Sequence, residues 1–99
     1  MDIVDRVEKR EARSILQELL DELRERPYSE LAKLIGDSQQ REITGESGTR
    51  YQVEMEAVWN DKREGNLRIV AAIDDGGWRA FVPLTDSFII APDGSFVGE

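Results

Sequence analysis

The acidic side chains are the chain's first candidates for chemistry. Glu54 and Glu56 stand two residues apart in a segment with alternating apolar residues, so both carboxylates share one face of a predicted strand. Strand geometry separates them by about 7 Å, a spacing that suits general acid–base work. Arg68 and Arg79 are expected on the same face, where they would form charge pairs with the two glutamates. Exposed, charge-paired carboxylates keep ordinary pKa values, so we assign no catalytic residue.

Two other patterns concern metal binding and catalysis. Asp74, Asp75 and Glu54 could supply oxygen ligands for Ca²⁺ or Mg²⁺, but the spaced acidic loop of a calcium site is missing. Gly36-Asp37-Ser38 resembles the start of a serine esterase motif, yet the sequence contains no histidine to activate a serine. The chain also has no cysteine, which excludes disulfides, thiolate metal sites and thiol nucleophiles. The sequence therefore predicts no metal and no cofactor.

Net charge and the distribution of apolar residues indicate which kinds of partner the chain can bind. The 99 residues include 21 acidic and 13 basic side chains and carry a net charge of −8, which disfavours nucleic acid and favours a basic protein surface. An acidic balance also serves simply to keep a protein dispersed. No apolar run is long enough to cross a membrane, and the N-terminus lacks the apolar segment of a secretory signal. We expect a cytoplasmic protein without a membrane partner.

The first third of the chain predicts two helices. Apolar residues recur at three- and four-residue steps through about residues 3–26, and charged residues fill the opposite side. Arg26-Pro27 ends this helix, and a short helix follows over about residues 28–35, with Gly36 at the left-handed position after it. Only about two heptads are clean, so packing on the protein's own sheet is favoured over a coiled coil.

The rest of the chain, about residues 40–91, predicts an antiparallel sheet with one buried face. A short strand at 40–45 places Ile43 inward, and a period of two then runs through three longer segments. The expected inward residues are Tyr51, Val53, Met55, Ala57, Leu67, Ile69, Ala71, Ile73, Trp78, Ala80, Val82 and Leu84.

Turn signals predict how these strands pair. Asp75-Gly76 is typical of a two-residue hairpin turn, which would place Ile73 opposite Trp78 and Leu67 opposite Leu84. The preceding long hairpin is expected to pair Ala57 with Ile69. Residues 92–99 form a C-terminal tail that either turns back as a final short hairpin or lies as an apolar extension.

Together these elements predict a single α+β domain over residues 1–99. An N-terminal helical hairpin, a long helix followed by a short one, is expected to pack on one face of a four- to five-stranded antiparallel meander.

The outward face of the sheet is the predicted interaction surface. An apolar strip bordered by charges has the anatomy of a protein interface. The alternative is that Phe88, Ile89 and Ile90 fold back and cover this strip themselves. The candidate interaction residues are Glu54, Glu56, Val58, Arg68, Val70, Arg79 and Phe81.

The segments YQVEMEAVW, IDDGGWRAFVPL and SFIIAPDGSFVGE carry a resemblance. Together they resemble stretches of small uncharacterised bacterial α+β proteins with no assigned activity. The resemblance covers roughly the C-terminal half of the chain and implies no site residues.

The predicted function is a small acidic protein–protein interaction module whose partner is an unknown protein, with a basic one favoured. The alternative is a small-ligand binder or a carboxylate-based enzyme that uses the outer sheet face. Self-association through the strip or the long helix is a third hypothesis.

Overall fold

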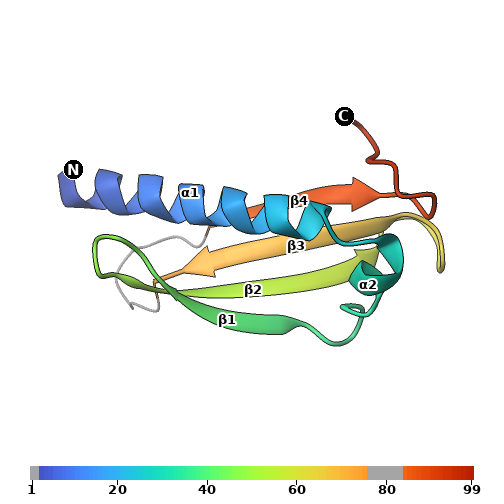
Figure 1. Cartoon of the computed structure of the whole chain (residues 1–99), viewed down its shortest axis with the longest axis horizontal. Helices are drawn as coiled ribbons and strands as arrows, with labels where there is room; N and C mark the ends of the chain where they lie inside the picture. Colours follow the sequence, from blue (N-terminus) through green and yellow to red (C-terminus); the bar gives the residue numbers. More distant parts are fainter. Residues whose placement is uncertain (1–2, 76–83) are drawn as a thin grey trace.

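The chain folds into two helices and a four-stranded antiparallel sheet (Figure 1). The computed structural model describes residues 3–75 and 84–99, with the backbone alone for residues 3–8. The strands follow one another across the sheet in the order β1-β2-β3-β4, which confirms the predicted α+β meander. The elements are α1 (Ile3–Arg24), α2 (Tyr28–Ala32), β1 (Gln39–Thr44), β2 (Arg50–Trp59), β3 (Leu67–Asp74) and β4 (Leu84–Ile90).

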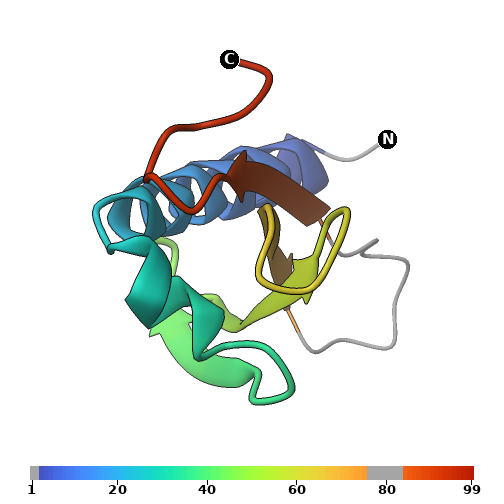
Figure 2. The same cartoon turned by 90° about the vertical axis from the view of Figure 1, so that its right-hand side faces the viewer.

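Helix α1 packs lengthwise on the β3–β4 half of the sheet (Figure 2). The amphipathic stripe explains this position, because it is the apolar side of α1 that meets the sheet. The helix ends two residues before the predicted boundary, since the N–H groups of Glu25 and Arg26 bond carbonyls three residues back and tighten the last turn. Its buried residues are Ala12, Leu16, Leu19, Leu20 and Leu23.

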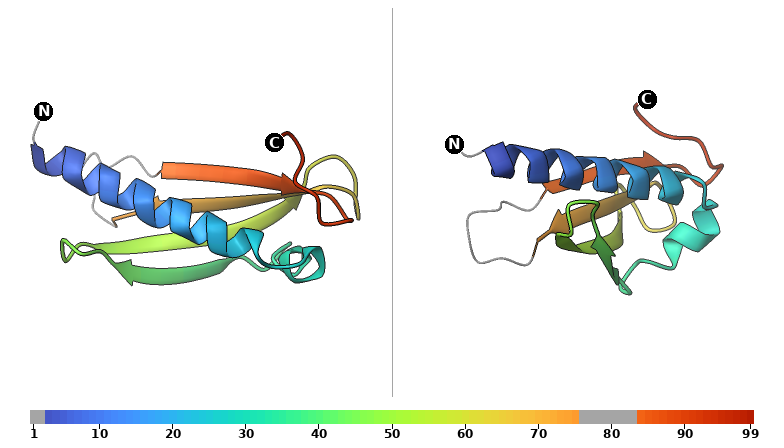
Figure 3. Two further views of the ribbon diagram at one scale, coloured as in Figure 1. Left: turned by 45° about the horizontal axis from the view of Figure 1, so that its top comes forward. Right: turned by 60° about the vertical axis from the view of Figure 1, so that its left-hand side comes forward.

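Helix α2 closes one end of the sheet beside the β2–β3 loop (Figure 3). It is shorter than the predicted 28–35, because Leu34 and Ile35 continue in three-residue hydrogen-bonded turns and Gly36 then takes a φ of +71°. The Tyr28 hydroxyl donates to the Gly65 carbonyl at 2.6 Å and ties α2 to that loop.

The register of the first three strands follows the predicted alternation. Ala57 lies opposite Ile69, and Glu56 lies opposite Val70, as the sequence predicted. Ile43 of β1 lies opposite Tyr51 and faces inward, although it remains only partly buried.

The predicted partner of β3 is wrong. In the structure β3 pairs with β4, so that Ile73 lies opposite Leu84 and Leu67 lies opposite Ile90. The predicted inward residues Trp78, Ala80 and Val82 lie outside the described residues. The observed pairing places the large side chains of Phe88 and Ile90 in the core, where burial of each contributes about 1.5–3 kcal/mol.

The β3–β4 pairing also fixes the position of the C-terminal segment. Phe88, Ile89 and Ile90 belong to β4, so the alternative in which they cover the outer face is wrong. The tail turns back as a short hairpin, with Phe96 bridged to Ile90 and the Val97 N–H donating to the Ile89 carbonyl at 2.9 Å.

The core lies between α1 and the inward face of β2, β3 and β4. Except for the half-buried Ile43 and Leu84, every predicted inward residue that the structure describes is buried there. The described sheet residues in the core are Tyr51, Val53, Met55, Ala57, Leu67, Ile69, Ala71, Ile73, Phe88 and Ile90.

Candidate binding groove and outer sheet face

The outer face of the sheet holds five of the seven predicted interaction residues. Val58, Arg68 and Ile89 form one row across β2, β3 and β4, and Glu56, Val70 and Ser87 form the next. Ile89 belongs to this face as part of the sheet, through the observed β3–β4 register, and does not fold over it. Arg79 and Phe81 lie outside the described residues.

Hydrogen bonds between side chains cross much of this face. Gln40 donates to Glu54 at 3.1 Å, and the Arg68 guanidinium donates to Asn60 and Ser87 at 3.2 and 3.3 Å. Val58 differs from these residues because it is apolar, and 45% of its surface is exposed. The described part of this face is therefore mixed, with polar side chains that hydrogen-bond to one another and with the exposed apolar side chain of Val58.

A shallow hollow of about 360 Å³ lies on the same face near Glu54 and Asp74. Its described lining combines the polar residues Gln40, Gln52, Glu54 and Asp74 with Val53 and Ala72, and it excludes the predicted partners Glu56 and Arg68. In the described parts of the chain, no three acidic side chains lie close enough together to hold a metal ion.

A second surface, absent from the sequence predictions, is the groove between α1 and β1. Because α1 packs on β3 and β4, the inward side of β1 is left partly open, and Ile43 is only half-buried. The groove consists of two hollows of about 440 and 120 Å³ that share Ile15, Glu18 and Ile43. Its lining residues are Arg10, Glu11, Ser14, Ile15, Glu18, Leu19, Glu22, Arg41, Ile43, Thr44, Gly45 and Glu46.

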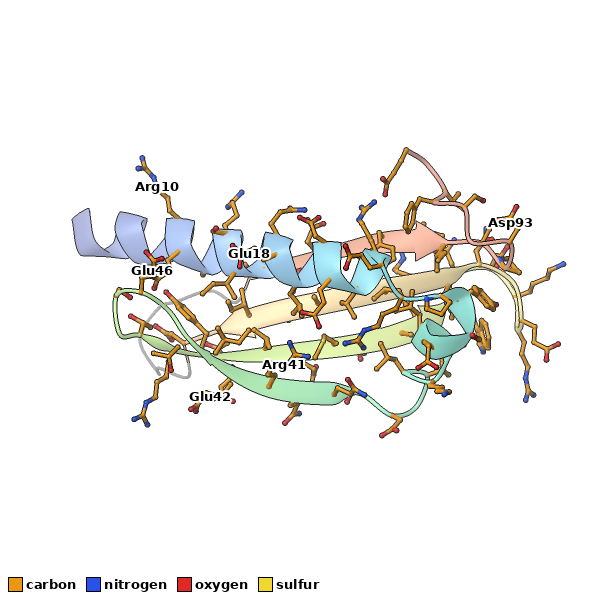
Figure 4. All side chains as sticks on the ribbon, viewed as in Figure 1. Arg10, Glu18, Arg41, Glu42, Glu46 and Asp93 are labelled. Atoms are coloured by element: carbon orange, nitrogen blue, oxygen red, sulfur yellow. The ribbon has the colours of Figure 1, made fainter. Side chains whose placement is uncertain are left out.

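The groove has an apolar floor and charged sides. Ile15 of α1 and Ile43 of β1 form the floor common to both hollows. Figure 4 shows Glu18 on α1, Glu46 in the β1–β2 turn and Arg41 on β1 around this space. Across one end, Arg41 contacts Glu22 at 3.5 Å, an exposed pair of the kind worth at most about 1 kcal/mol.

The outer edge of β1 borders this groove. Among the strands that the structure describes, β1 has β2 as its only neighbour, so its other edge has no strand partner. The Gly45 N–H donates to the Thr49 carbonyl at 2.8 Å, on the side of β2. Backbone groups alternate along an antiparallel strand, so those of Gln40, Glu42 and Thr44 point to the free edge. The hydrogen bond from the Asn60 N–H to the Asn66 carbonyl, at the far end of β2, gives an independent check. Alternation along β2 from that bond again leaves the backbone groups of Gln40, Glu42 and Thr44 pointing away from β2.

Glu11 holds the β1–β2 turn against α1 at one end of the groove. Its carboxylate accepts hydrogen bonds from the Ser47 hydroxyl, from the Ser47 N–H at 3.0 Å and from the Tyr51 hydroxyl at 2.9 Å. These bonds, the Ser47 hydroxyl foremost, lower the pKa of Glu11 from its ordinary 4.5. A Cβ atom at Gly45 would overlap this carboxylate and force it to shift away from its donors.

We expect Glu11→Gln to lower the melting temperature at pH 7 and to flatten its fall on acidification. The wild-type interaction stabilises the folded state above the ordinary carboxyl pKa and is lost as the pH falls through the depressed folded pKa. Glutamine is neutral and has one acceptor oxygen for three donors, so the stabilisation is reduced at pH 7, and the two melting curves converge at low pH, where Glu11 is protonated. Melting curves from pH 7 to pH 3 measure the effect, with Glu25→Gln as an exposed control. Superimposable curves for Glu11→Gln and wild type would contradict this role.

Comparison of the chain with protein-family models, curated proteins and solved structures found no match. No helix among the described residues is long and apolar enough to cross a membrane. We therefore interpret the two surfaces from their own geometry.

One feature of the sequence indicates this groove, namely the scarcity of apolar residues in β1. The segment QQREIT has a single large apolar residue, Ile43, whereas β2 and β3 place apolar residues at every second position. That pattern is typical of an edge strand with an incompletely covered inward side.

Proposed function

We propose that the protein is a protein–protein interaction module that binds an extended segment of its partner in the α1–β1 groove. The observation that carries the proposal is the coincidence of an unpaired strand edge with an open groove whose floor is apolar. An extended chain could bond to the outward backbone groups of β1 and place alternate side chains in the groove. The predicted cytoplasmic location belongs to the same proposal.

Two features of the groove favour this mode of binding. The backbone groups of Glu42 and Thr44 supply donors and acceptors along the free edge, which gives affinity independent of sequence. Ile15 and Ile43 supply a contact for an apolar side chain, which gives selectivity. The hydrogen bonds from Ser47 and Tyr51 to Glu11 hold the β1–β2 turn against α1. One end of the groove is therefore already formed before a partner binds.

A proline at Glu42 tests the proposal. Its N–H points to the free edge, so Glu42→Pro removes a donor for the partner without removing a β1–β2 hydrogen bond. Linear peptides selected from a random phage-displayed library on the wild-type protein should bind this variant at least tenfold more weakly. Circular dichroism and the melting temperature report whether the fold is retained.

The matched control is Glu42→Ala. It removes the same carboxylate, which accepts a hydrogen bond from Gln52 at 3.0 Å, but keeps the backbone N–H. Peptide affinity should stay within about twofold of wild type, because strand addition depends on the backbone. Equal binding by the proline and alanine variants would refute strand addition at β1.

The outer sheet face is a second proposed surface, favoured by the exposure of Val58. Peptides that retain affinity for Glu42→Pro but lose it for Val58→Ser would assign binding to that face. The hollow beside Glu54 and Asp74 is the corresponding place for the small-ligand alternative.

A further inference from the structure

We infer that the occupant of the α1–β1 groove is a basic extended segment with an apolar residue flanked, two positions away on each side, by lysine or arginine. The inference rests on the proposed function and specifies the chemistry of the partner. Its grounds are the charge around the groove and the spacing of the groove's apolar and acidic residues.

The charge of the groove is unbalanced. Its described lining contains four carboxylates and two guanidinium groups, a net negative charge within a chain of net charge −8. The carboxylates are Glu11, Glu18, Glu22 and Glu46, and the guanidinium groups are Arg10 and Arg41. Complementary charge steers and orients a partner, and here it selects a basic one.

The positions of these groups define a pattern in the ligand. Side chains on one side of a strand repeat about every 7 Å, so an apolar residue on the Ile15–Ile43 floor has same-side neighbours about 7 Å away in both directions. Toward the β1–β2 turn the groove is lined by Glu46, and toward the C-terminal end of α1 it is lined by Glu22, so each carboxylate lies on the side of one such neighbour. A basic residue on both sides satisfies the groove whichever way the segment runs.

Glu22 already shows the contact expected of a bound cation. It accepts hydrogen bonds from Arg26 at 3.3 Å and from Arg41 at 3.5 Å. Because Arg41 belongs to β1 and reaches across the smaller hollow, a lysine or arginine from the ligand can replace it on Glu22. Such a replacement exchanges one exposed ion pair for another at little cost.

A second copy of this chain fits the groove poorly. Two β1 edges related by a twofold axis through Glu42 would place the two Glu42 carboxylates directly opposite each other, which destabilises strand pairing. Both copies would also carry a net charge of −8. The charge distribution therefore favours a different, basic protein.

The test uses the peptides TKTITKT, TETITET and TKTSTKT with the full chain, measured by fluorescence anisotropy. TKTITKT should bind at least about tenfold more tightly than TETITET, because charge complementarity selects the basic peptide. Serine at the centre should weaken binding by a similar factor. In about 1 M salt, where the screening length falls to about 3 Å, the preference for the basic peptide should largely disappear.

Paired variants locate the effect. Glu22→Gln/Glu46→Gln, which removes the two carboxylates assigned to the flanking lysines, should weaken TKTITKT binding about fivefold to tenfold, whereas Glu25→Gln/Glu56→Gln, which removes the same charge elsewhere, should leave it unchanged. Weakening by the second pair instead would place the peptide outside the groove and overturn the inference.

Two outcomes separate this inference from the proposed function. Equal affinities for TKTITKT and TETITET, both lost in Glu42→Pro, would overturn the basic preference and leave strand addition standing. A concentration-dependent dimer in light scattering that Glu42→Pro converts to monomer would show that a second copy fills the edge and would overturn the basic partner.

Discussion

Ile69→Asp should abolish the cooperative unfolding transition of the domain. Ile69 is fully buried in the middle of β3, with Ala57 and Phe88 as its cross-strand neighbours. The substitution loses about 1.5–3 kcal/mol of apolar burial and adds a buried carboxylate that costs several kcal/mol more. Small domains are stable by only about 5–15 kcal/mol, so little or none of the folded state should remain. Far-ultraviolet circular dichroism during heating measures the transition.

Val58→Asp is the control for this substitution. It introduces the same carboxylate into the neighbouring strand, but Val58 is 45% exposed on the outer face. The expected loss is about 1 kcal/mol, the range of strand propensity differences, and the transition should remain cooperative. A normal midpoint for Ile69→Asp would refute the assignment of inner and outer faces.

Phe88→Ala should destabilise the domain by about 3–5 kcal/mol, the usual cost of truncating a buried phenylalanine. Phe88 is 3% exposed and faces the core from β4. Its ring meets Phe96 edge to face at 5.6 Å and lies under the Arg24 guanidinium at 4.9 Å, so the truncation also loosens the C-terminal tail. Urea unfolding followed by tryptophan fluorescence gives the change in unfolding free energy.

Ile89→Ala tests the same strand from its other side. Ile89 is half-buried on the outer face, so its truncation should cost about 1 kcal/mol. The large difference in destabilisation between Phe88→Ala and Ile89→Ala follows from the observed β3–β4 register, in which Phe88 lies opposite Ile69. Similar losses for the two variants would contradict that register.

The proposed function connects these features of the fold. α1 protects the β3–β4 half of the core and by the same placement leaves β1 exposed on its inward side. The β3–β4 half supplies the stability that Ile69→Asp and Phe88→Ala are designed to test. The β1 side, with its open strand edge and the acidic α1–β1 groove, supplies the surface that the peptide-binding experiments test.

Local patterns in the sequence determined the element types and the sheet faces. Alternation through Tyr51, Val53 and Met55 predicted the inward side of β2, and the three- and four-residue steps predicted the stripe of α1. These predictions succeeded because each depends on the geometry of one helix or one strand. The choice of an α+β meander followed from the order of the elements.

The tertiary structure decided which strands meet and which surfaces stay open. The Asp75-Gly76 turn signal is local and pointed to the nearest segment, whereas the observed partner of β3 contributes Phe88 and Ile90 to a shared core. The groove beside Ile43 depends on where α1 crosses the sheet, a result of packing between segments far apart in the chain. The sequence by itself therefore determined the elements and their buried sides, while the competition for burial among distant segments determined the pairing and the open edge.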